Sequence, residues 1–204
     1  MQHFKTVIVL AVIAGSVFFC CGLSTAGQPD GFKALMLYYS RTGNTRAACE
    51  ALQKELGADI QEIQDQNSRE KRFGMIAGMF KTILGMQTDI KPETVDFSPY
   101  DTLVISAPIW AARFGLAMRT FVKRSDFDGK NVIIFITADS FIEKKYQQKH
   151  TALVESSGGK VKGYFQVQAA DPVDGDKVLR TQEKIVEETL RLVPAIKACI
   201  AGNN

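Results

Sequence analysis

The chain has 204 residues, of which 46% are hydrophobic and 23% are charged, as in a globular protein with a sizeable core. The formal net charge of +3 is small, and no Lys and Arg cluster alternates with aromatic residues. The composition therefore argues against a nucleic-acid-binding protein.

Residues 1–26 have the pattern of an export signal. Lys5 precedes an apolar run from residue 6 to residue 23, and the small residues Ser24-Thr25-Ala26 follow. This order predicts a secretory signal cleaved after Ala26, and it leaves residues 27–204 as one exported domain, in the periplasm or another extracytoplasmic space. The run is slightly short for a spanning helix, so an uncleaved membrane anchor through residues 6–23 is the alternative.

Beyond residue 33, apolar runs typical of buried strands alternate with stretches of helical spacing. Strands are expected at residues 33–39, 58–63, 101–107, 131–137 and 161–167. Helices are expected at residues 44–57, 116–123, 141–156 and 176–198, with Pro194 kinking or fraying the last one. This alternation predicts right-handed βαβ units, and hence a doubly wound, five-stranded parallel sheet within a three-layer α/β/α domain.

The connection from residue 67 to residue 99 is long for such a fold. Its apolar residues predict a helix that covers one face of the sheet, and the alternative is a lid beside the ligand site. Cys49 and Cys199 fall at opposite ends of the expected sheet, which predicts two free, buried thiols.

The loop after the first strand carries the strongest functional signal. It reads Ser40-Arg41-Thr42-Gly43-Asn44-Thr45 and leads directly into a helix. Hydroxyl and amide groups around one glycine, together with the free N–H groups of a helix N-terminus, predict a phosphate-binding loop. The alternative is an ordinary helix cap made by the same residue types.

A second segment follows the third strand and holds the only tryptophan. It reads Ala107-Pro108-Ile109-Trp110-Ala111 and is expected to be a loop at the carboxyl edge of the sheet. Ligands in doubly wound sheets bind at that edge, so Trp110 is placed to stack on a flat ring. The alternative is a Trp that fills a gap between helix and sheet.

These two segments together resemble the flavodoxin family. The resemblance extends from the Tyr38-Tyr39 that precedes the first loop, through Trp110, to Met118-Arg119-Thr120-Phe121. It implies the strand order 2-1-3-4-5 and an FMN cofactor. Its phosphate would lie in the loop 40–45, and its ring would be flanked by residues 107–111 and by the loop after the fourth strand.

That third loop departs from the family pattern. It reads Ala138-Asp139-Ser140, where flavodoxin-like proteins often have glycines. These side chains are expected to border the flavin, and Asp139 would disfavour added negative charge there and lower the potential. The departure also leaves open a site with another cofactor or none.

The family resemblance implies a flavoprotein that transfers electrons between redox partner proteins. An FMN-dependent NAD(P)H or quinone oxidoreductase is the enzyme alternative, and a non-redox binding protein on the same fold is the other. No catalytic side chain and no metal ligand set is expected. His150 is the only histidine after the signal, and it lies in a helix rich in Lys and Gln, which predicts a surface position.

Overall fold

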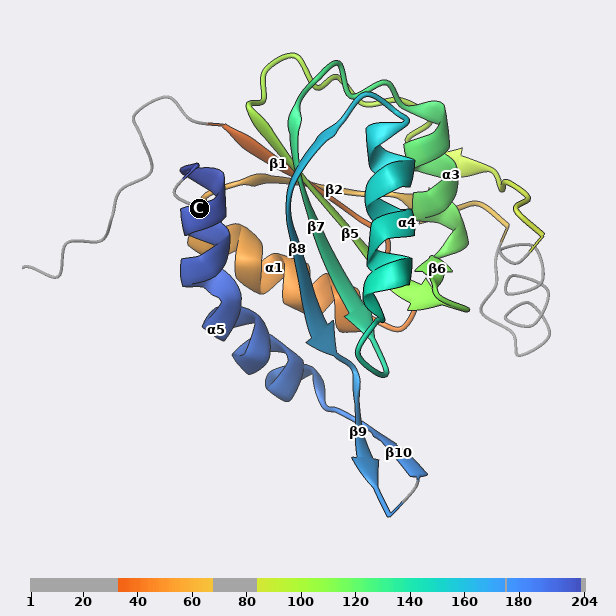
Figure 1. Cartoon of the computed structure of the whole chain (residues 1–204), viewed down its shortest axis with the longest axis vertical. Coiled ribbons are helices and arrows are strands. Elements are labelled where there is room, and N and C mark those ends of the chain that lie inside the picture. The colour runs from red at the N-terminus through yellow and green to blue at the C-terminus, as the bar shows by residue number, and fades with distance from the viewer. Residues whose placement is uncertain (1–32, 68–83, 175, 203–204) are drawn as a thin grey trace, which may run out of the picture.

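The computed structural model describes residues 33–67, 84–174 and 176–202; the predicted signal and residues 68–83 of the connection 67–99 lie outside them. A parallel sheet forms the centre of the molecule, in the order β2-β1-β5-β7-β8 (Figure 1). In chain order these strands are 2-1-3-4-5, which confirms the expected topology. Their bounds are Asp59–Glu62, Ala34–Tyr38, Thr102–Trp110, Asn131–Ala138 and Lys160–Gln168.

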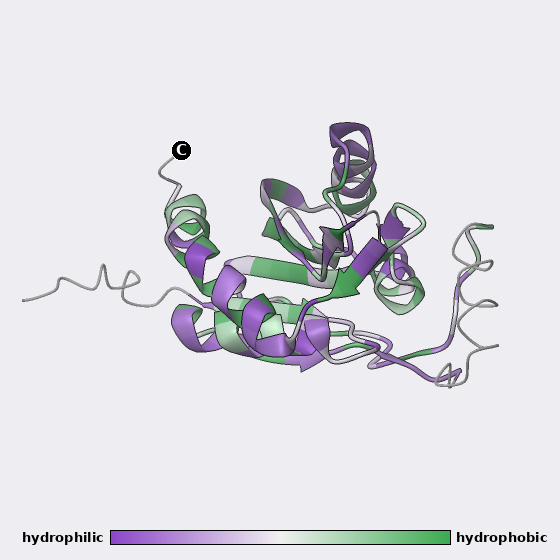
Figure 2. Ribbon diagram, turned by 90° about the horizontal axis from the view of Figure 1, so that it is seen from below, coloured by the Kyte–Doolittle hydropathy of each residue, from purple (hydrophilic) through white to green (hydrophobic). Residues whose placement is uncertain are grey.

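The central strands are apolar throughout because helices cover both faces of the sheet. Leu35 and Leu37 of β1 contribute to one buried cluster, and Met36 and Tyr38 contribute to the other. This alternation is the period of two that every strand imposes on its side chains. Figure 2 accordingly shows hydrophobic strands in the middle of the molecule and helices with hydrophilic segments outside them.

The four described helices are divided between the two faces. Residues of α1 (Asn44–Leu56) and α5 (Gln182–Ile200) join the cluster that contains Met36. Residues of α3 (Leu116–Arg124) and α4 (Lys144–Glu155) join the cluster that contains Leu37. The helices predicted at residues 44–57, 116–123 and 141–156 are thereby confirmed, and Cys49 and Cys199 are free and buried as expected. The helix predicted in the connection 67–99 falls mainly on residues outside the described ranges and stays a prediction.

The start of the last helix was predicted wrongly. The residues expected to begin it form the strand β10 (Asp176–Leu179) instead, which pairs antiparallel with β9 (Ala170–Val173) in a hairpin. The hairpin projects beyond the carboxyl ends of β7 and β8 (Figure 1). The helix α5 begins only at Gln182, after the N-cap Thr181, and it continues through Pro194 to Ile200, so the last turns do not fray at the proline.

Three short strands complete the described structure. β3 (Gln64–Asp65) pairs with β4 (Ile90–Lys91) and brings the two described ends of the long connection together. β6 (Arg113–Phe114) pairs antiparallel with the end of β5 and adds a sixth strand to the sheet.

Candidate functional site

The loop 40–45 lies at the carboxyl end of β1 and begins α1. Gly43 is the N-cap residue, and its φ of 93° falls in the left-handed region that glycine adopts without strain. No side chain caps the helix, and no acidic residue lies in its first turn. The capping interpretation is therefore not supported, and the first N–H groups of α1 remain available to an anion.

The side chains of this loop divide into two groups. The Ser40 hydroxyl is buried and has no hydrogen-bond partner among the described residues, and Thr42 is exposed. By contrast, Thr45 is buried, and its hydroxyl lies 2.7 Å from that of Thr137 at the end of β7. An unpaired buried hydroxyl is costly, so Ser40 fits a site that receives an acceptor, whereas Thr45 joins the loop to a neighbouring strand.

A residue missed by the sequence analysis also approaches this loop. A Cβ on Gly43 would lie 2.7 Å from the side-chain Nε2 of Gln182, the first residue of α5. Gln182 thus places an amide donor beside the loop, from an element more than 130 residues away in the sequence. Only the three-dimensional structure could bring it here, because the charged residues around it are typical of any helix start.

The second segment is not the loop that was expected. Pro108, Ile109 and Trp110 extend β5, and a two-residue turn at Ala111 and Ala112 leads into β6. Both alanines have positive φ angles, 46° and 57°, as a tight turn that follows the twist of a β-hairpin requires. The structure therefore holds Trp110 on a hairpin, which fixes it more firmly than a loop would.

Trp110 lies beside the end of β1. It is partly buried, and its ring meets that of Tyr39 edge to face, with centroids 5.8 Å apart. Tyr39 directly precedes Ser40, so this contact brings the second segment against the phosphate-loop candidate. The structure thereby joins two of the three segments that the sequence singled out.

The third segment is held by residues of β8. The Gln166 side chain accepts a hydrogen bond from Ile142 N–H at 3.0 Å and donates one to the Ser140 carbonyl at 2.8 Å. Ala138 is buried, while Asp139 and Ser140 are exposed, and Lys177 of β10 lies 4.0 Å from the Asp139 carboxylate. Gln166 is a second positioning residue that the sequence analysis missed.

His150 is buried, contrary to the prediction of a surface position. Its ring stacks on Phe114 at 4.7 Å between centroids, and it is only 3% exposed. Nε2 lies 3.0 Å from the Ala112 carbonyl and Nδ1 lies 2.8 Å from the Tyr164 hydroxyl. Because a carbonyl can only accept, Nε2 carries the proton. Burial lowers the pKa of His150, although the bond to Ala112 opposes this.

The reason for the error is the mixed character of α4. Its polar residues dominate the composition, but Tyr146, His150 and Val154 recur at intervals of four and form one face toward the sheet. That spacing was visible in the sequence and would have placed His150 inside. The histidine ties the Ala111–Ala112 turn to α4, so it supports the hairpin that carries Trp110.

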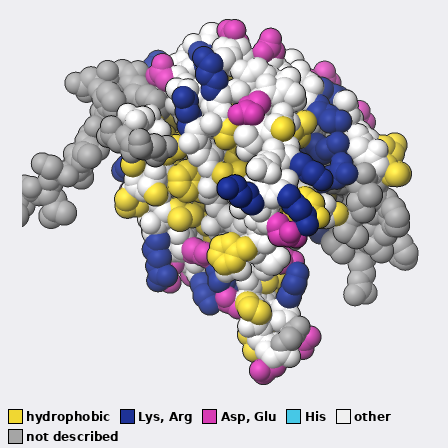
Figure 3. Space-filling model, in the orientation of Figure 1, with side chains coloured by type: hydrophobic (Ala, Val, Ile, Leu, Met, Phe, Trp, Pro, Cys, Tyr) yellow, Lys and Arg dark blue, Asp and Glu magenta, His cyan; other side chains and the backbone are white. Residues whose placement is uncertain are grey.

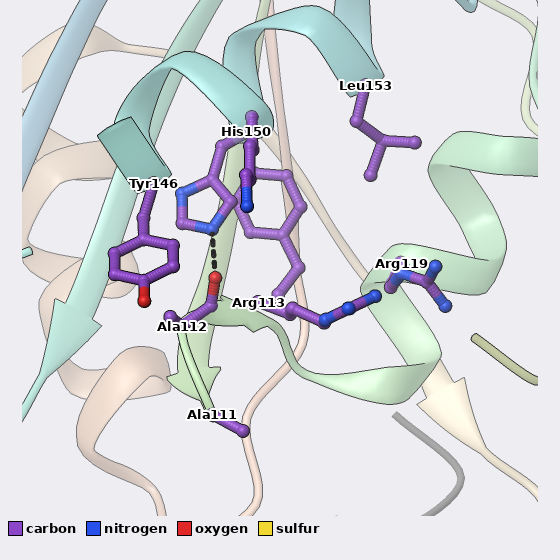
Figure 4. A pocket seen from close by; sticks show the side chains of 9 residues that line it. Ala111, Ala112, Arg113, Arg119, Tyr146, His150 and Leu153 are labelled. Carbon is purple, nitrogen blue, oxygen red and sulfur yellow. Dashed lines mark hydrogen bonds between the residues drawn. The ribbon is translucent and has the colours of Figure 1, made fainter. Parts of the chain in front are cut away.

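Two pockets adjoin these segments. One of about 580 Å³ lies between the phosphate-loop candidate and the chain after β2. Its lining includes Ser40, Arg41 and Thr42, together with the ion pair between Arg46 and Glu62, whose atoms are 2.6 Å apart. The other pocket, of about 380 Å³, lies between β6, α3 and α4 and includes Ala111 and His150 (Figure 4). Trp110 and residues 138–140 line neither of these two pockets.

Within residues 33–67, 84–174 and 176–202, no group of three or more His, Cys, Asp or Glu side chains is placed to hold a metal ion. None of the helices in these ranges combines the length and the apolar character needed to cross a bilayer.

The arrangement is that of a doubly wound α/β protein with a helix N-terminus free of a side-chain cap at the end of its first strand. A family model described as flavodoxin matches residues 33–162, which is more than half of the chain. The chain belongs to the flavodoxin family.

Solved structures agree with this assignment at the level of the fold. A flavoprotein from Lactobacillus acidophilus, crystallised in complex with FMN, is 21% identical with a TM-score of 0.58, covering 66% of this chain and 93% of its own. A Bacteroides uniformis protein described as a flavoprotein is 20% identical with a TM-score of 0.57, covering 78% and 97%. A protein from Bacteroides eggerthii, also described as a flavoprotein, is 23% identical with a TM-score of 0.51. The match covers 79% of this chain and 98% of that protein. No curated protein matches the chain.

Proposed function

We propose that this flavodoxin-family protein binds FMN at the carboxyl edge of its sheet and carries electrons between redox partner proteins. The single observation that carries the cofactor assignment is the buried Ser40 hydroxyl, unpaired among the described residues, beside an uncapped helix N-terminus. A phosphate monoester supplies the acceptor that both features need. The Lactobacillus acidophilus protein in complex with FMN shares this fold and supports the choice of cofactor.

Each segment has a part in this assignment. Ser40, Thr42 and the N–H groups from Gly43 onward would hold the phosphate, with Arg41, Asn44 and Thr45 in the same loop. Trp110 would lie against the flavin, with the rest of the 107–111 hairpin beside it. Residues 138–140 would border the ring from β7, held there by Gln166.

The redox chemistry is supplied by the bound flavin, which can transfer one or two electrons. The protein would bind the phosphate, orient the ring and exclude water from one side of it. His150, the one histidine within the described ranges, makes hydrogen bonds with both ring nitrogens and is buried. It is therefore poorly placed to act as an acid or base. An FMN-dependent NAD(P)H or quinone oxidoreductase is the alternative to the carrier, and turnover measurements separate the two.

The assignment is tested by titrating the purified protein with FMN and following the flavin absorption and fluorescence. Thr42→Ala combined with Asn44→Ala should weaken FMN binding by several kcal/mol, because each hydrogen bond to a charged group contributes about 1.5–3 kcal/mol. Thr151→Ala on α4, outside the loop and both pockets, is the matched control and should bind FMN like the parent.

The outcomes of this titration separate the alternatives. Unchanged affinity in the double variant would remove the phosphate assignment, and no uptake of FMN by the parent would favour the non-redox binding protein. Steady oxidation of NAD(P)H with a quinone by the FMN-loaded parent would favour the oxidoreductase over the carrier.

We also propose that the chain is exported or anchored outside the cytoplasm by residues 1–26. The support is the order of Lys5, the apolar run 6–23 and the small residues before Gly27. Cell fractionation followed by N-terminal sequencing tests this. A chain that begins at Gly27 in the extracytoplasmic fraction supports cleavage, a full-length chain in the membrane fraction supports anchoring, and a full-length cytoplasmic chain contradicts both.

A further inference from the structure

The pocket between β6, α3 and α4 has an unusual electrostatic lining. Arg113, Arg119 and Lys149 line it, and none of the described residues that line it is acidic. Figure 4 shows the Arg113 side chain extending from β6 toward the Arg119 side chain of α3. Like charges repel at such range, so three cations without a carboxylate form a site that an anion would stabilise.

Arg119 is the central residue of this argument. It is only 9% exposed, and its Nη1 is buried without a hydrogen-bond partner among the described residues. Burial, and then the nearby Arg113, lower the pKa of Arg119, so both effects disfavour its charged form. A buried, unpaired guanidinium is costly for the folded state, and this cost is removed when a ligand supplies the acceptors.

The surroundings strengthen the positive field. Lys123 and Arg124 of α3 and Lys144 and Lys145 of α4 lie near the ends of these helices. Figure 3 shows that Lys and Arg side chains gather over this part of the molecule, with few acidic side chains between them. Such a field raises the local concentration of small anions.

The size of the pocket indicates what kind of anion it fits. Its volume of about 380 Å³ is within the range of small-molecule sites, and it exceeds what one phosphate ion needs. Two arginines suit a phosphate because a guanidinium can donate two parallel hydrogen bonds to it. Tyr146 and Phe114 supply aromatic surface at the wall of the same pocket.

We propose that Arg113, Arg119 and Lys149 form a second binding site, which takes the phosphate group of a small organic phosphate ester. This site is separate from the loop 40–45 and does not depend on FMN being the ligand there. It adjoins the turn at Ala111 and Ala112, so a ligand in it would lie next to the hairpin that carries Trp110.

The test is isothermal titration calorimetry on the full-length, FMN-saturated protein. AMP, inorganic phosphate and adenosine are titrated in separate experiments. AMP should bind, adenosine should not, and phosphate should bind more weakly than AMP, as expected for a phosphate ester site. Arg119→Met should weaken AMP binding at least about tenfold, because it removes hydrogen bonds to a charged group. The AMP affinity of Arg119→Lys should lie between those of the parent and Arg119→Met. Lysine keeps the positive charge but cannot donate two parallel hydrogen bonds to one phosphate.

Two controls make the result specific. Arg191→Met removes an exposed arginine on α5 and should leave AMP binding unchanged. Thr42→Ala with Asn44→Ala, measured without added FMN, should also leave AMP binding intact, which separates this site from the loop 40–45.

Without ligand, Arg119→Met should unfold at a higher temperature than the parent, because it removes an unpaired buried charge.

The proposal is overturned if the parent binds neither AMP nor phosphate at concentrations up to about 10 mM, which corresponds to very weak binding. It is equally overturned if Arg119→Met binds AMP as tightly as the parent does. Loss of AMP binding in the Thr42 and Asn44 variant but not in Arg119→Met would assign the ligand to the first loop instead.

Discussion

At the scale of single residues, His150 combines a structural role with a titratable group. Its ring is enclosed by Phe114 and Tyr164, and its hydrogen bond to Ala112 holds the turn between β5 and β6. The charged groups that share its pocket are the cations Arg113, Arg119 and Lys149. Burial favours the neutral ring, and the hydrogen bond to Ala112 opposes this effect.

This environment predicts how stability depends on pH. The folded-state pKa of His150 lies below its unfolded value of about 6.5, so the unfolded chain binds the extra proton more readily. The stabilisation is therefore complete above about pH 6.5 and is lost as the pH falls through the folded pKa. Urea unfolding of the parent should show a lower free energy of unfolding at pH 5.5 than at pH 7.5.

His150→Gln provides the comparison. It should cost about 1–3 kcal/mol at pH 7.5, because a buried ring and its hydrogen bonds are replaced. The difference between variant and parent should shrink at pH 5.5, since the variant has no imidazole to protonate. A constant difference at the two pH values would show that His150 does not titrate in this range. NMR of the imidazole resonance that the variant lacks gives its pKa directly.

At the scale of elements, the parallel strands were predictable and the hairpins were not. The runs in β1, β5 and β7 are apolar because both faces of the sheet are covered, and this pattern can be read without coordinates. The β9–β10 hairpin was missed because its strands are short and β10 was assigned to the following helix. The pair Asp174-Gly175 was the available signal, and Asp174 has the positive φ of 50° typical of such turns.

Arg180 anchors that hairpin, which predicts how it would open. The side chain is 10% exposed, bonds Asp171 through Nε at 2.8 Å and Nη2 at 2.6 Å, and also pairs with Glu188 of α5. Arg180, and then Lys184, hold the pKa of Asp171 at about 2. Because this pKa is below the usual value near 3.9, the contribution of Asp171 is present above about pH 4 and is lost toward pH 2.

Arg180→Met should therefore loosen the hairpin without unfolding the sheet. Amide hydrogen exchange in residues 170–179 should become at least about tenfold faster, since hydrogen bonds to charged groups are lost. Exchange in β7 should stay as in the parent. Arg191→Met, which breaks an exposed pair within α5, is the matched control. Equal protection of the hairpin in both variants would mean that backbone pairing alone holds it.

At the scale of the whole molecule, the carboxyl edge of the sheet depends on contacts between distant segments. The hydroxyls of Thr45 and Thr137 join the start of α1 to β7, Trp110 meets Tyr39, and Gln182 approaches Gly43 from α5. The sequence predicted which loops lie at this edge, because strand order and handedness determine it. It could not predict the roles of Gln166 and Gln182, because these contacts exist only once the chain has folded.

A ligand that contacts several of these segments at once should stabilise the entire fold. Binding to the folded state alone adds RT ln(1 + [L]/Kd), which is about 2.7 kcal/mol at a hundredfold excess of ligand over Kd. For a domain of this size, such a gain raises the unfolding midpoint by roughly 5–10 °C. Differential scanning calorimetry with FMN should show this shift, and the Thr42→Ala, Asn44→Ala variant should lose most of it.

Riboflavin isolates the contribution of the phosphate, because it carries the same ring and lacks the anion. If the N-terminus of α1 and the Ser40 hydroxyl supply most of the binding free energy, riboflavin should shift the midpoint far less than FMN at equal concentration. If the two ligands shift it equally, the contact with Trp110 and the 138–140 segment dominates instead, and the loop 40–45 makes little contribution. The comparison thereby shows whether the phosphate or the ring of the cofactor contributes more of the binding free energy.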